Sequence, residues 1–288
     1  MQGGTHMAHN QQKKLAVIND FCGFGRCSLT VSLPVVSALK VQCCPVPTSV
    51  FSNHTAYDSF FYTDYTSNME AYIAEWKKLG LTFDGILTGF LGSPEQTEIV
   101  RHFLEYFKKE GTVTVVDPVM GDEGSLYATY SPELAKQMKR LLPYADILTP
   151  NLTEACILTD TVYRTEAGNA ELTRICKKLC ALGPKKIVIS GLEREDRLIN
   201  FVYEEGKEPV EVAGPKIGPC RAGTGDVFSS MIAADAVNGV SFQTSVRHAA
   251  VFIAKVLRRA VELDIPVTDG ICFEEFLAEI GEGAEEKK

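Results

Sequence analysis

The chain has 288 residues, of which 45% are hydrophobic and 23% charged, and it carries a net charge of −8. This balance is typical of a soluble globular enzyme and argues against a nucleic-acid-binding or membrane-binding surface, so neither partner is expected. No apolar run approaches the roughly 20 residues of a membrane span, and the first residues lack the apolar core of a signal peptide. Nine cysteines without a C-x-x-C pair suit reduced thiols, which predicts a cytoplasmic location.

One domain is expected over residues 13–281, because no repeat, low-complexity segment or linker divides the chain. Residues 1–12 read as a polar extension or cloning remnant, and residues 282–288 as a solvated tail. The folded domain is therefore expected between these two segments.

Short apolar runs alternate with helical patterns along the chain. Strands are expected at residues 15–18, 41–50, 84–90, 112–117, 147–149 and 185–191, followed by an antiparallel pair at 197–203 and 208–212. Helices are expected at residues 28–39, 67–79, 94–109, 165–182, 242–263 and 273–280. Pro45 and Pro47 indicate an edge or bent strand. Because the strands lack clean apolar–polar alternation, we expect an α/β fold with helices on both faces of a mostly parallel sheet.

A glycine-rich stretch at residues 221–226 runs without a break into a helix that ends near residue 237. Backbone N–H groups in the first turn of a helix have no intrahelical partner, and glycine lets a phosphate approach them closely. The stretch therefore predicts an anion site over residues 222–225, with Asp226 as a general base for phosphoryl transfer. The alternative is an ordinary helix start in which Asp226 is a favourable first-turn residue.

Polar groups follow several of the expected strands, and in parallel sheets ligands bind beyond the carboxyl ends of the strands. This rule selects Asp20, Gly89 and the segments 117–122 and 149–154. Three carboxylates, Asp117, Asp122 and Glu154, could converge there from neighbouring strand ends, which suits Mg²⁺ on a nucleotide. Each also has an ordinary interpretation, as part of an Asp-Pro turn or of a helix start.

Two loops are candidate ligand contacts. Residues 51–57 form a polar loop in which His54 is either a ligand contact or a structural hydrogen-bonding residue. Residues 214–221 contain two glycines and two prolines and are expected to be a mobile cover over the nucleotide. In that cover, Lys216 and Arg221 either reach phosphate or are simply solvated.

Taken in order, these pieces resemble the ribokinase-like superfamily and, within it, the pyridoxal (pyridoxine, pyridoxamine) kinases. The resemblance covers about residues 14–280. The Gly-Thr-Gly-Asp piece at 223–226 is shared by the whole superfamily, whereas Phe-Ser-Asn-His-Thr at 51–55 is similar to pyridoxal kinases in particular. The other matching pieces are 19–20, 87–89, 117–122, 149–154 and 188–191.

The resemblance implies a three-layer α/β/α sandwich that transfers a phosphoryl group from ATP to the 5′-hydroxymethyl group of a pyridoxal-type vitamer. Asp226 would be the base that takes the hydroxyl proton. The amides that would hold the transferred group belong to Ala222, Gly223, Thr224 and Gly225. The vitamer would be contacted by Asn19, Asp20, His54, Thr55 and Gly89.

The resemblance also implies ATP and Mg²⁺, with a monovalent cation as an open addition. Mg²⁺ would be managed, directly or through water, by Asp117, Asp122 and Glu154. The nucleotide would be contacted by Asp117, Thr149, Asn151, Glu154, Ser190, Gly191 and Lys216. A homodimer is usual for proteins of this kind and is expected here.

Two other functions stay open. Pyridoxal kinases commonly carry Ser at the end of the first strand, whereas this chain has Asn19 and Asp20, which brings it nearer to the related hydroxymethylpyrimidine kinases. From a different class, the chain could be a vitamer-binding sensor on a kinase scaffold. Nothing in the sequence favours the sensor, because the base, the anion site and the metal carboxylates are all present.

Overall fold

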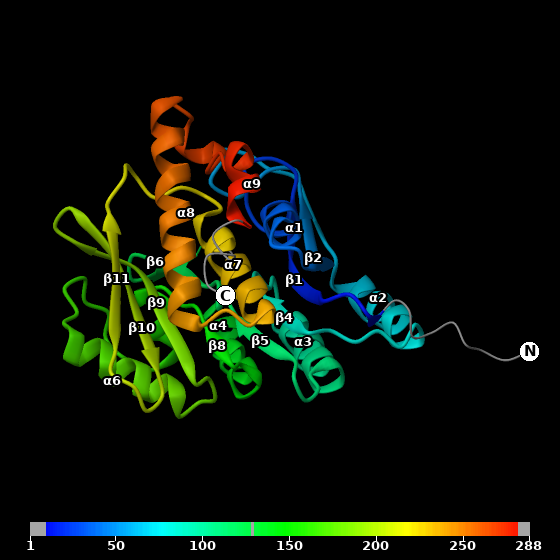
Figure 1. The fold of residues 1–288 in the computed structure, drawn as a ribbon. Helices are drawn as coiled ribbons and strands as arrows, with labels where there is room; N and C mark the ends of the chain where they lie inside the picture. The colour runs from blue at the N-terminus through cyan, green and yellow to red at the C-terminus, as the bar shows by residue number, and fades with distance from the viewer. Residues whose placement is uncertain (1–9, 128–129, 282–288) are drawn as a thin grey trace, which may run out of the picture.

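The computed structural model describes residues 10–127 and 130–281, and a nine-stranded sheet runs through its centre (Figure 1). The strands lie in the order β11-β10-β9-β8-β5-β4-β1-β2-β3. The pairs from β2 through β1, β4, β5 and β8 to β9 are parallel, whereas β3, β10 and β11 are antiparallel to their neighbours. Their bounds are β1 Lys14–Cys22, β2 Gln42–Phe51, β3 Tyr62–Asp64, β4 Gly85–Thr88, β5 Val113–Val116, β8 Ile147–Leu148, β9 Lys186–Arg194, β10 Arg197–Glu204 and β11 Val210–Pro215.

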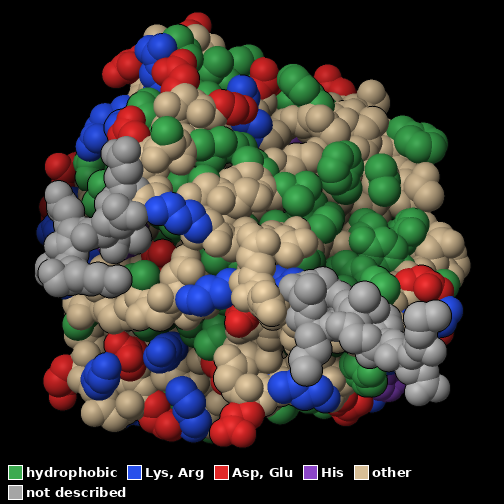
Figure 2. Space-filling view, turned by 45° about the vertical axis from the view of Figure 1, so that its right-hand side comes forward, with side chains coloured by type: hydrophobic (Ala, Val, Ile, Leu, Met, Phe, Trp, Pro, Cys, Tyr) green, Lys and Arg blue, Asp and Glu red, His purple; other side chains and the backbone are tan. Residues whose placement is uncertain are grey.

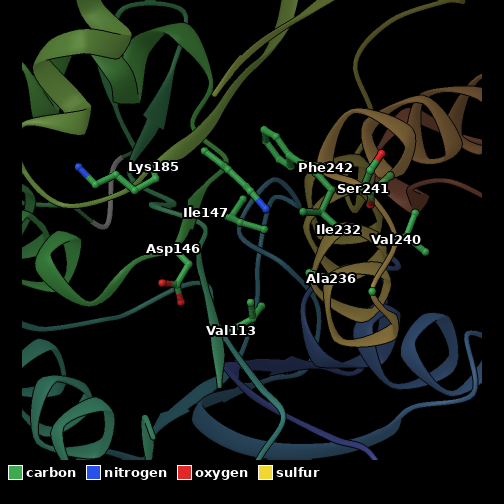
Figure 3. A pocket seen from close by; sticks show the side chains of 12 residues that line it. Val113, Asp146, Ile147, Lys185, Ile232, Ala236, Val240, Ser241 and Phe242 are labelled. Atoms are coloured by element: carbon green, nitrogen blue, oxygen red, sulfur yellow. The ribbon is translucent and has the colours of Figure 1, made fainter. Parts of the chain in front are cut away.

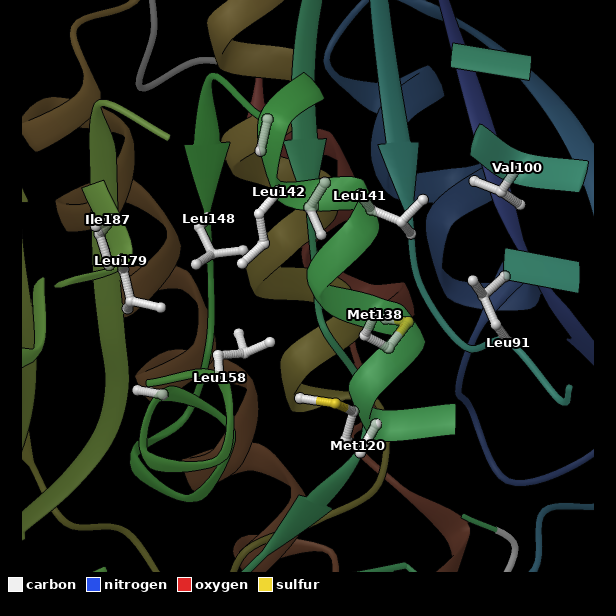
Figure 4. Close-up of a cluster of buried hydrophobic side chains, with 14 of the residues drawn as sticks. Leu91, Val100, Met120, Met138, Leu141, Leu142, Leu148, Leu158, Leu179 and Ile187 are labelled. Carbon is white, nitrogen blue, oxygen red and sulfur yellow. The ribbon is translucent and has the colours of Figure 1, made fainter. Parts of the chain in front are cut away.

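Helices cover both faces of this sheet, which confirms the expected three-layer α/β/α architecture. One face packs against α1 (Leu29–Ala38), α7 (Thr224–Asn238), α8 (Phe242–Glu262) and α9 (Leu277–Ile280). The other packs against α2 (Thr66–Lys78), α3 (Pro94–Phe107), α4 (Pro132–Met138), α5 (Leu152–Leu158) and α6 (Asn169–Cys180). Figure 4 shows leucine, isoleucine and methionine side chains filling the space between the sheet and this second layer. Among the described residues, no helix is both long and apolar enough to span a membrane.

Helix α3 shows how the sequence builds these layers. Ser93 caps its amino terminus by accepting a hydrogen bond from the Gln96 N–H, and Pro94 occupies the first helical position, where no N–H is needed. Phe103 and Phe107, one turn apart, are buried against the sheet. Truncation of Phe103 to alanine would cost about 3 to 5 kcal/mol of stability through the cavity it leaves.

The chain reverses its direction of travel across the sheet between β1 and β4. From β1 it passes through α1 to β2 on one side, and from α2 it returns to β4 on the other side. β1 is therefore hydrogen bonded to both β2 and β4. In open parallel sheets such a reversal leaves a crevice at the carboxyl ends of the two strands, where ligands bind.

Several element bounds differ from the expectations. β1 continues through Asn19 and Asp20 to Cys22, because it pairs with β2 beyond that point, so these two residues lie within the strand. β2 is not the outermost strand, but β3 pairs only with its last residues, and Pro45 and Pro47 lie where its outer side is unpaired. Helix α6 begins at Asn169 and not at residue 165. The sequence analysis missed α4 and the small hairpin β6–β7 (Gly121–Asp122 and Ser125–Leu126).

Two further segments bear on the expectations. Within the predicted extension, the Asn10 side chain donates to the Gly80 carbonyl and accepts from the Thr82 N–H. In the predicted cover, β11 extends to Pro215, so only residues 216–220 connect the sheet to the glycine-rich stretch.

Candidate active site

The carboxyl ends of β1 and β4 meet the amino terminus of α7 at the reversal point of the sheet. β1 contributes Asn19 and Asp20, and Gly89 follows β4 directly. Asp226 lies in the first turn of α7, and its carboxylate accepts a hydrogen bond of 3.2 Å from the Asn19 amide nitrogen. Four of the predicted site residues are thus brought together from segments far apart in the chain.

Asp20 and Asp226 form a buried pair of acidic side chains. Burial, together with the negative charge of Asp226, raises the pKa of Asp20 to about 7, although the Ser28 hydroxyl opposes the shift. Burial also raises the pKa of Asp226, while hydrogen bonds from the Ser28 backbone and the Asn19 side chain lower it in part. A carboxylate whose pKa is moved toward neutrality can accept a proton more readily than a solvated one.

The amino terminus of α7 is built as an open anion site. Gly223 is its N-cap, with φ 81°, and no side chain caps the helix. A Cβ at Gly223 would lie 1.9 Å from the Arg26 carbonyl oxygen, so only glycine fits between the two loops. The first-turn N–H groups of a helix left without a side-chain cap favour an anion.

The three predicted metal carboxylates do not share one environment. Asp117 is buried, and burial and the charge of Asp226 raise its pKa to about 8. Glu154 is buried, and its two oxygens accept from the Met120 and Asn151 N–H groups, the latter in a capping box. Asp122 is exposed on the β6–β7 hairpin.

These carboxylates fit a cation whose remaining ligands are phosphate oxygens and water. Within residues 10–127 and 130–281, no ion pair joins Asp117, Glu154 or Asp226 to a lysine or arginine, and hydrogen bonds alone stabilise their charge. Burial and the negative charge of Asp117 raise the pKa of Glu154 well above its ordinary value. In the same residues no group of three or more His, Cys, Asp or Glu side chains could hold a metal ion alone. This pattern suits Mg²⁺, which usually keeps waters and binds with substrate phosphates.

The predicted nucleotide residues lie along the next strand ends. Asn151 bridges to Ser190 at the point where β8 and β9 diverge, and its side chain donates to the Gly121 carbonyl. Thr149 is buried, whereas Gly191 is exposed. Lys216 stands apart, because its ammonium group pairs with Glu193 at 2.7 Å on the surface. A role for Lys216 on phosphate would require that ion pair to open.

The segment 265–274 ties together the loops that carry Arg26, His54 and Arg221, a role that was not expected from the sequence. Arg26 donates to the Asp269 carbonyl. The Arg221 guanidinium is buried, and its Nη1 donates to the Ile265 and Pro266 carbonyls, so it is not solvated. His54 Nε2 lies 2.6 Å from the Thr268 carbonyl oxygen, while its Nδ1 accepts from the Ala56 N–H. With both ring nitrogens engaged, His54 occupies a structural position here. Thr55 next to it is exposed.

Ser28 also contributes to the site, although it was not among the predicted site residues. It is buried with φ 60° and ψ −138°, a conformation that is strained for a residue with a Cβ. Its backbone reaches Asp226 and its side chain reaches Asp20. The only sequence signal was its place before the first helix.

Two cavities lie away from this site. One of about 500 Å³ opens at the amino ends of the strands, between Val113, Ile147 and the start of α8 (Figure 3). The other, of about 560 Å³, is lined by residues 163–166. Neither is lined by a predicted site residue.

Comparisons with known proteins point to one family. A family model described as phosphomethylpyrimidine kinase matches residues 32–268. Two crystal structures from Bacteroides thetaiotaomicron, both provisionally assigned as a phosphomethylpyrimidine kinase, are 37% and 36% identical, with TM-scores of 0.92 and 0.90. The alignments cover 95% and 94% of this chain and 96% of each of theirs, and the second structure is a crystal form with pyridoxal.

Two curated relatives carry different names. The chain is 33% identical over 258 residues to the thiamine biosynthetic bifunctional enzyme TH1 of Arabidopsis thaliana, covering 88% of this chain but only 48% of that protein. It is 26% identical over 264 residues to the pyridoxal kinase PdxY of Leifsonia xyli subsp. xyli, covering 86% of this chain and 90% of that protein. The chain thus spans about half of the first relative and most of the second.

Proposed function

The chain belongs to the phosphomethylpyrimidine kinase family, and from this premise we propose that it is an ATP-dependent kinase that phosphorylates the 5′-hydroxymethyl group of pyridoxal, pyridoxamine or pyridoxine. The observation that carries the proposal is the buried carboxylate of Asp226 at the uncapped start of α7, beside the ends of β1 and β4. A similar protein crystallised with pyridoxal supports the choice of vitamer.

In this proposal Asp226 takes the proton from the substrate hydroxyl, and the hydroxyl oxygen forms a bond to the γ-phosphorus of ATP. The bond from that phosphorus to the β–γ bridging oxygen breaks, and ADP leaves. Charge on the transferred group is held by the N–H groups of residues 222–225. Phosphoryl transfer asks a protein mainly for positioning and charge compensation, so one base and a set of amide donors are sufficient.

Mg²⁺ would supply the remaining charge compensation on the phosphates of ATP. Asp117 and Glu154 would hold it, together with water, because their buried carboxylates have no cationic partner among the described side chains. Asp122 is exposed and would join only through water or on closure of the hairpin. Thr149, Asn151, Ser190 and Gly191 would line the nucleotide.

The deciding experiment is ATP-dependent formation of the vitamer 5′-phosphate by the purified chain, followed by mass spectrometry and with EDTA as the metal-free control. We expect one phosphate per ADP formed and loss of turnover in EDTA. Binding of pyridoxal by calorimetry without any turnover of ATP would contradict the proposal and revive the sensor on a kinase scaffold.

A hydroxymethylpyrimidine kinase is the second candidate. It is favoured by Asn19 and Asp20 at the end of β1, and by the thiamine-biosynthetic relative. Values of kcat/KM for pyridoxal and for hydroxymethylpyrimidine separate the two, because both substrates offer a hydroxymethyl group to the same base. A higher kcat/KM for the pyrimidine would reassign the substrate and leave the phosphoryl transfer intact.

We also propose a homodimer and a cytoplasmic location. On the face shown in Figure 2, hydrophobic side chains gather at the upper right, while charged side chains concentrate toward the left and lower edges. The largest exposed hydrophobic residues include Phe61 and Tyr62, at 71% and 53% exposure, on the edge strand β3 and just before it. An exposed edge of this kind is a ready surface for a second copy. Sedimentation velocity should show a dimer that Phe61→Lys weakens.

A further inference from the structure

We propose that Asn19 is a positioning residue that fixes and tunes the base Asp226, and not a substrate ligand. The inference rests on the proposed function, because it assigns Asn19 a role in the same phosphoryl transfer. It replaces the sequence-based expectation that Asn19 contacts the vitamer. The side chain is 4% exposed, which leaves almost none of its surface for a ligand.

The orientation of the Asn19 amide group is determined by its partners. Its Oδ1 accepts two backbone hydrogen bonds, 3.0 Å from Asp20 N and 2.8 Å from Phe90 N. Both partners are donors, so the oxygen must face them, and the amide nitrogen must face Asp226. That nitrogen lies 3.2 Å from Asp226 Oδ1. One side chain therefore joins the ends of β1 and β4 to the first turn of α7.

Gly89 leaves the space for this arrangement. A Cβ at Gly89 would lie 2.6 Å from both the carbon and the nitrogen of the Asn19 amide group, and 2.8 Å from its oxygen. Any side chain there would push the amide away from Asp226. Glycine at this position is thus explained by Asn19, and Gly89 acts on the base through it.

The amide N–H stabilises the ionised form of Asp226. A hydrogen bond to a buried carboxylate lowers its pKa against the effect of burial, and here the Ser28 backbone acts in the same direction. Asp226 also interacts electrostatically with two other buried acids, Asp20 on β1 and Asp117 directly after β5, and both side chains are kept in every variant tested below. Removal of the Asn19 donor should therefore raise the pKa of Asp226. The base would be protonated over a wider range of pH, and the acidic limb of kcat/KM would move to higher pH.

The test compares the pH profiles of kcat/KM for the wild type, Asn19→Ala, Asn19→Asp and Gly89→Ala. Asn19→Ala should move the acidic limb upward by roughly one pH unit and lower kcat on the plateau about 10-fold, with KM changed less. Asn19→Asp keeps an acceptor for both backbone N–H groups but places a second carboxylate beside Asp226. The acidic limb of its kcat/KM profile should therefore move to still higher pH than in Asn19→Ala. Gly89→Ala should shift the limb in the same direction.

Asn238→Ala is the matched control, because it removes an amide from the other end of the same helix, where it donates to the Leu39 carbonyl. It should leave the limb in place. An unmoved limb in folded Asn19→Asp and Gly89→Ala would overturn the proposal, since a purely structural amide changes stability without changing the pKa of the base.

A readout independent of turnover separates this inference from the proposed function. The ¹³C-carboxyl resonance of Asp226, assigned by its absence in Asp226→Asn, can be titrated by NMR in the wild type and in Asn19→Asp. A higher pKa in the variant supports the inference even if no vitamer is phosphorylated. Equal pKa values overturn it even if the wild type is an active kinase.

Discussion

The two edges of the parallel sheet treat acidic side chains in opposite ways. At the amino ends, Asp146 accepts from the Thr114 N–H and pairs with Lys108 at 2.7 Å, and the exposed Asp84 accepts from the Lys14 N–H. At the carboxyl ends, Asp20 and Asp117 are buried without a cation from the described residues, and their pKa values are raised to about 7 and 8.

This difference between the environments of the acidic side chains indicates that the carboxyl ends of the strands bind the ligand. Asp146 is paired with a lysine, and Asp84 is hydrogen bonded and exposed to water, so these two carboxylates can stay ionised without a ligand. Buried ionised carboxylates at the carboxyl edge destabilise the protein without ligands. A bound proton, metal ion or substrate can offset this cost. Strain and uncompensated charge gather where function is expected.

The largest expected effect is on kcat, which should fall on substitution of an acid at the carboxyl edge of the sheet but not at the amino edge. Asp226→Asn should lower kcat by about 10²- to 10⁴-fold, because it removes the proposed base. The same change at the amino edge, Asp146→Asn, should leave kcat within about two-fold of the wild type, because it touches neither substrate nor nucleotide. Steady-state kinetics on both variants checks this. Near-normal turnover in Asp226→Asn would show that another group accepts the proton.

The next effect compares the two ends of α7. Gly223 and Gly239 are its N-cap and C-cap, with φ 81° and 83°, but a Cβ at Gly239 has nothing within 4 Å. Gly239→Ala should cost about 1 kcal/mol from backbone conformation alone. Gly223→Ala should cost roughly 3 to 5 kcal/mol, because the loop that carries Arg26 must also move. Denaturant unfolding gives both values, and equal costs would contradict the close approach.

The last prediction concerns the free energy of unfolding and how the contribution of Asp20 to it changes with pH. Asp20 has a raised pKa, so the folded chain holds its proton more tightly than the unfolded chain, and stability from this group falls as pH rises from about 4 to about 7. Asp20→Asn should therefore leave stability unchanged near pH 4 and raise it by roughly 2 to 4 kcal/mol at pH 8.

Asp84→Ala, at the amino edge, supplies the contrast. Loss of its hydrogen bond to the Lys14 N–H should lower stability by about 1 kcal/mol. Thermal unfolding of both variants at pH 4 and pH 8 measures the comparison. Destabilisation by Asp20→Asn at pH 8 would show that the acid is compensated in a way that the geometry does not reveal.

The sequence was sufficient for the layers and for the edge of the sheet that carries the site. The rule for strand ends identified Asp117 and Glu154 as candidates, and the glycine-rich helix start identified Asp226, because both signals depend on local spacing. Contacts between distant segments were not predictable in this way. Arg221 was expected in solvent or on phosphate, but it binds carbonyls about 44 residues further along the chain.

The same limit applies to Asn19. The resemblance to pyridoxal kinases implied a substrate contact for this residue. Only the structure shows that both of its polar atoms are already bound, one of them to a residue 207 positions away. A single sequence carries no signal for such a pairing.

The segment 265–274 also has a consequence for the order in which the site can form during synthesis. Every strand of the sheet has been made once β11 is complete, but His54, Arg26 and Arg221 find their carbonyl partners only in this last part of the chain. A nascent chain stalled before residue 265 could assemble the sheet and yet leave the loops around Asp226 untethered. The loops around Asp226 thus depend for their positions on a segment that follows every strand of the sheet in the chain.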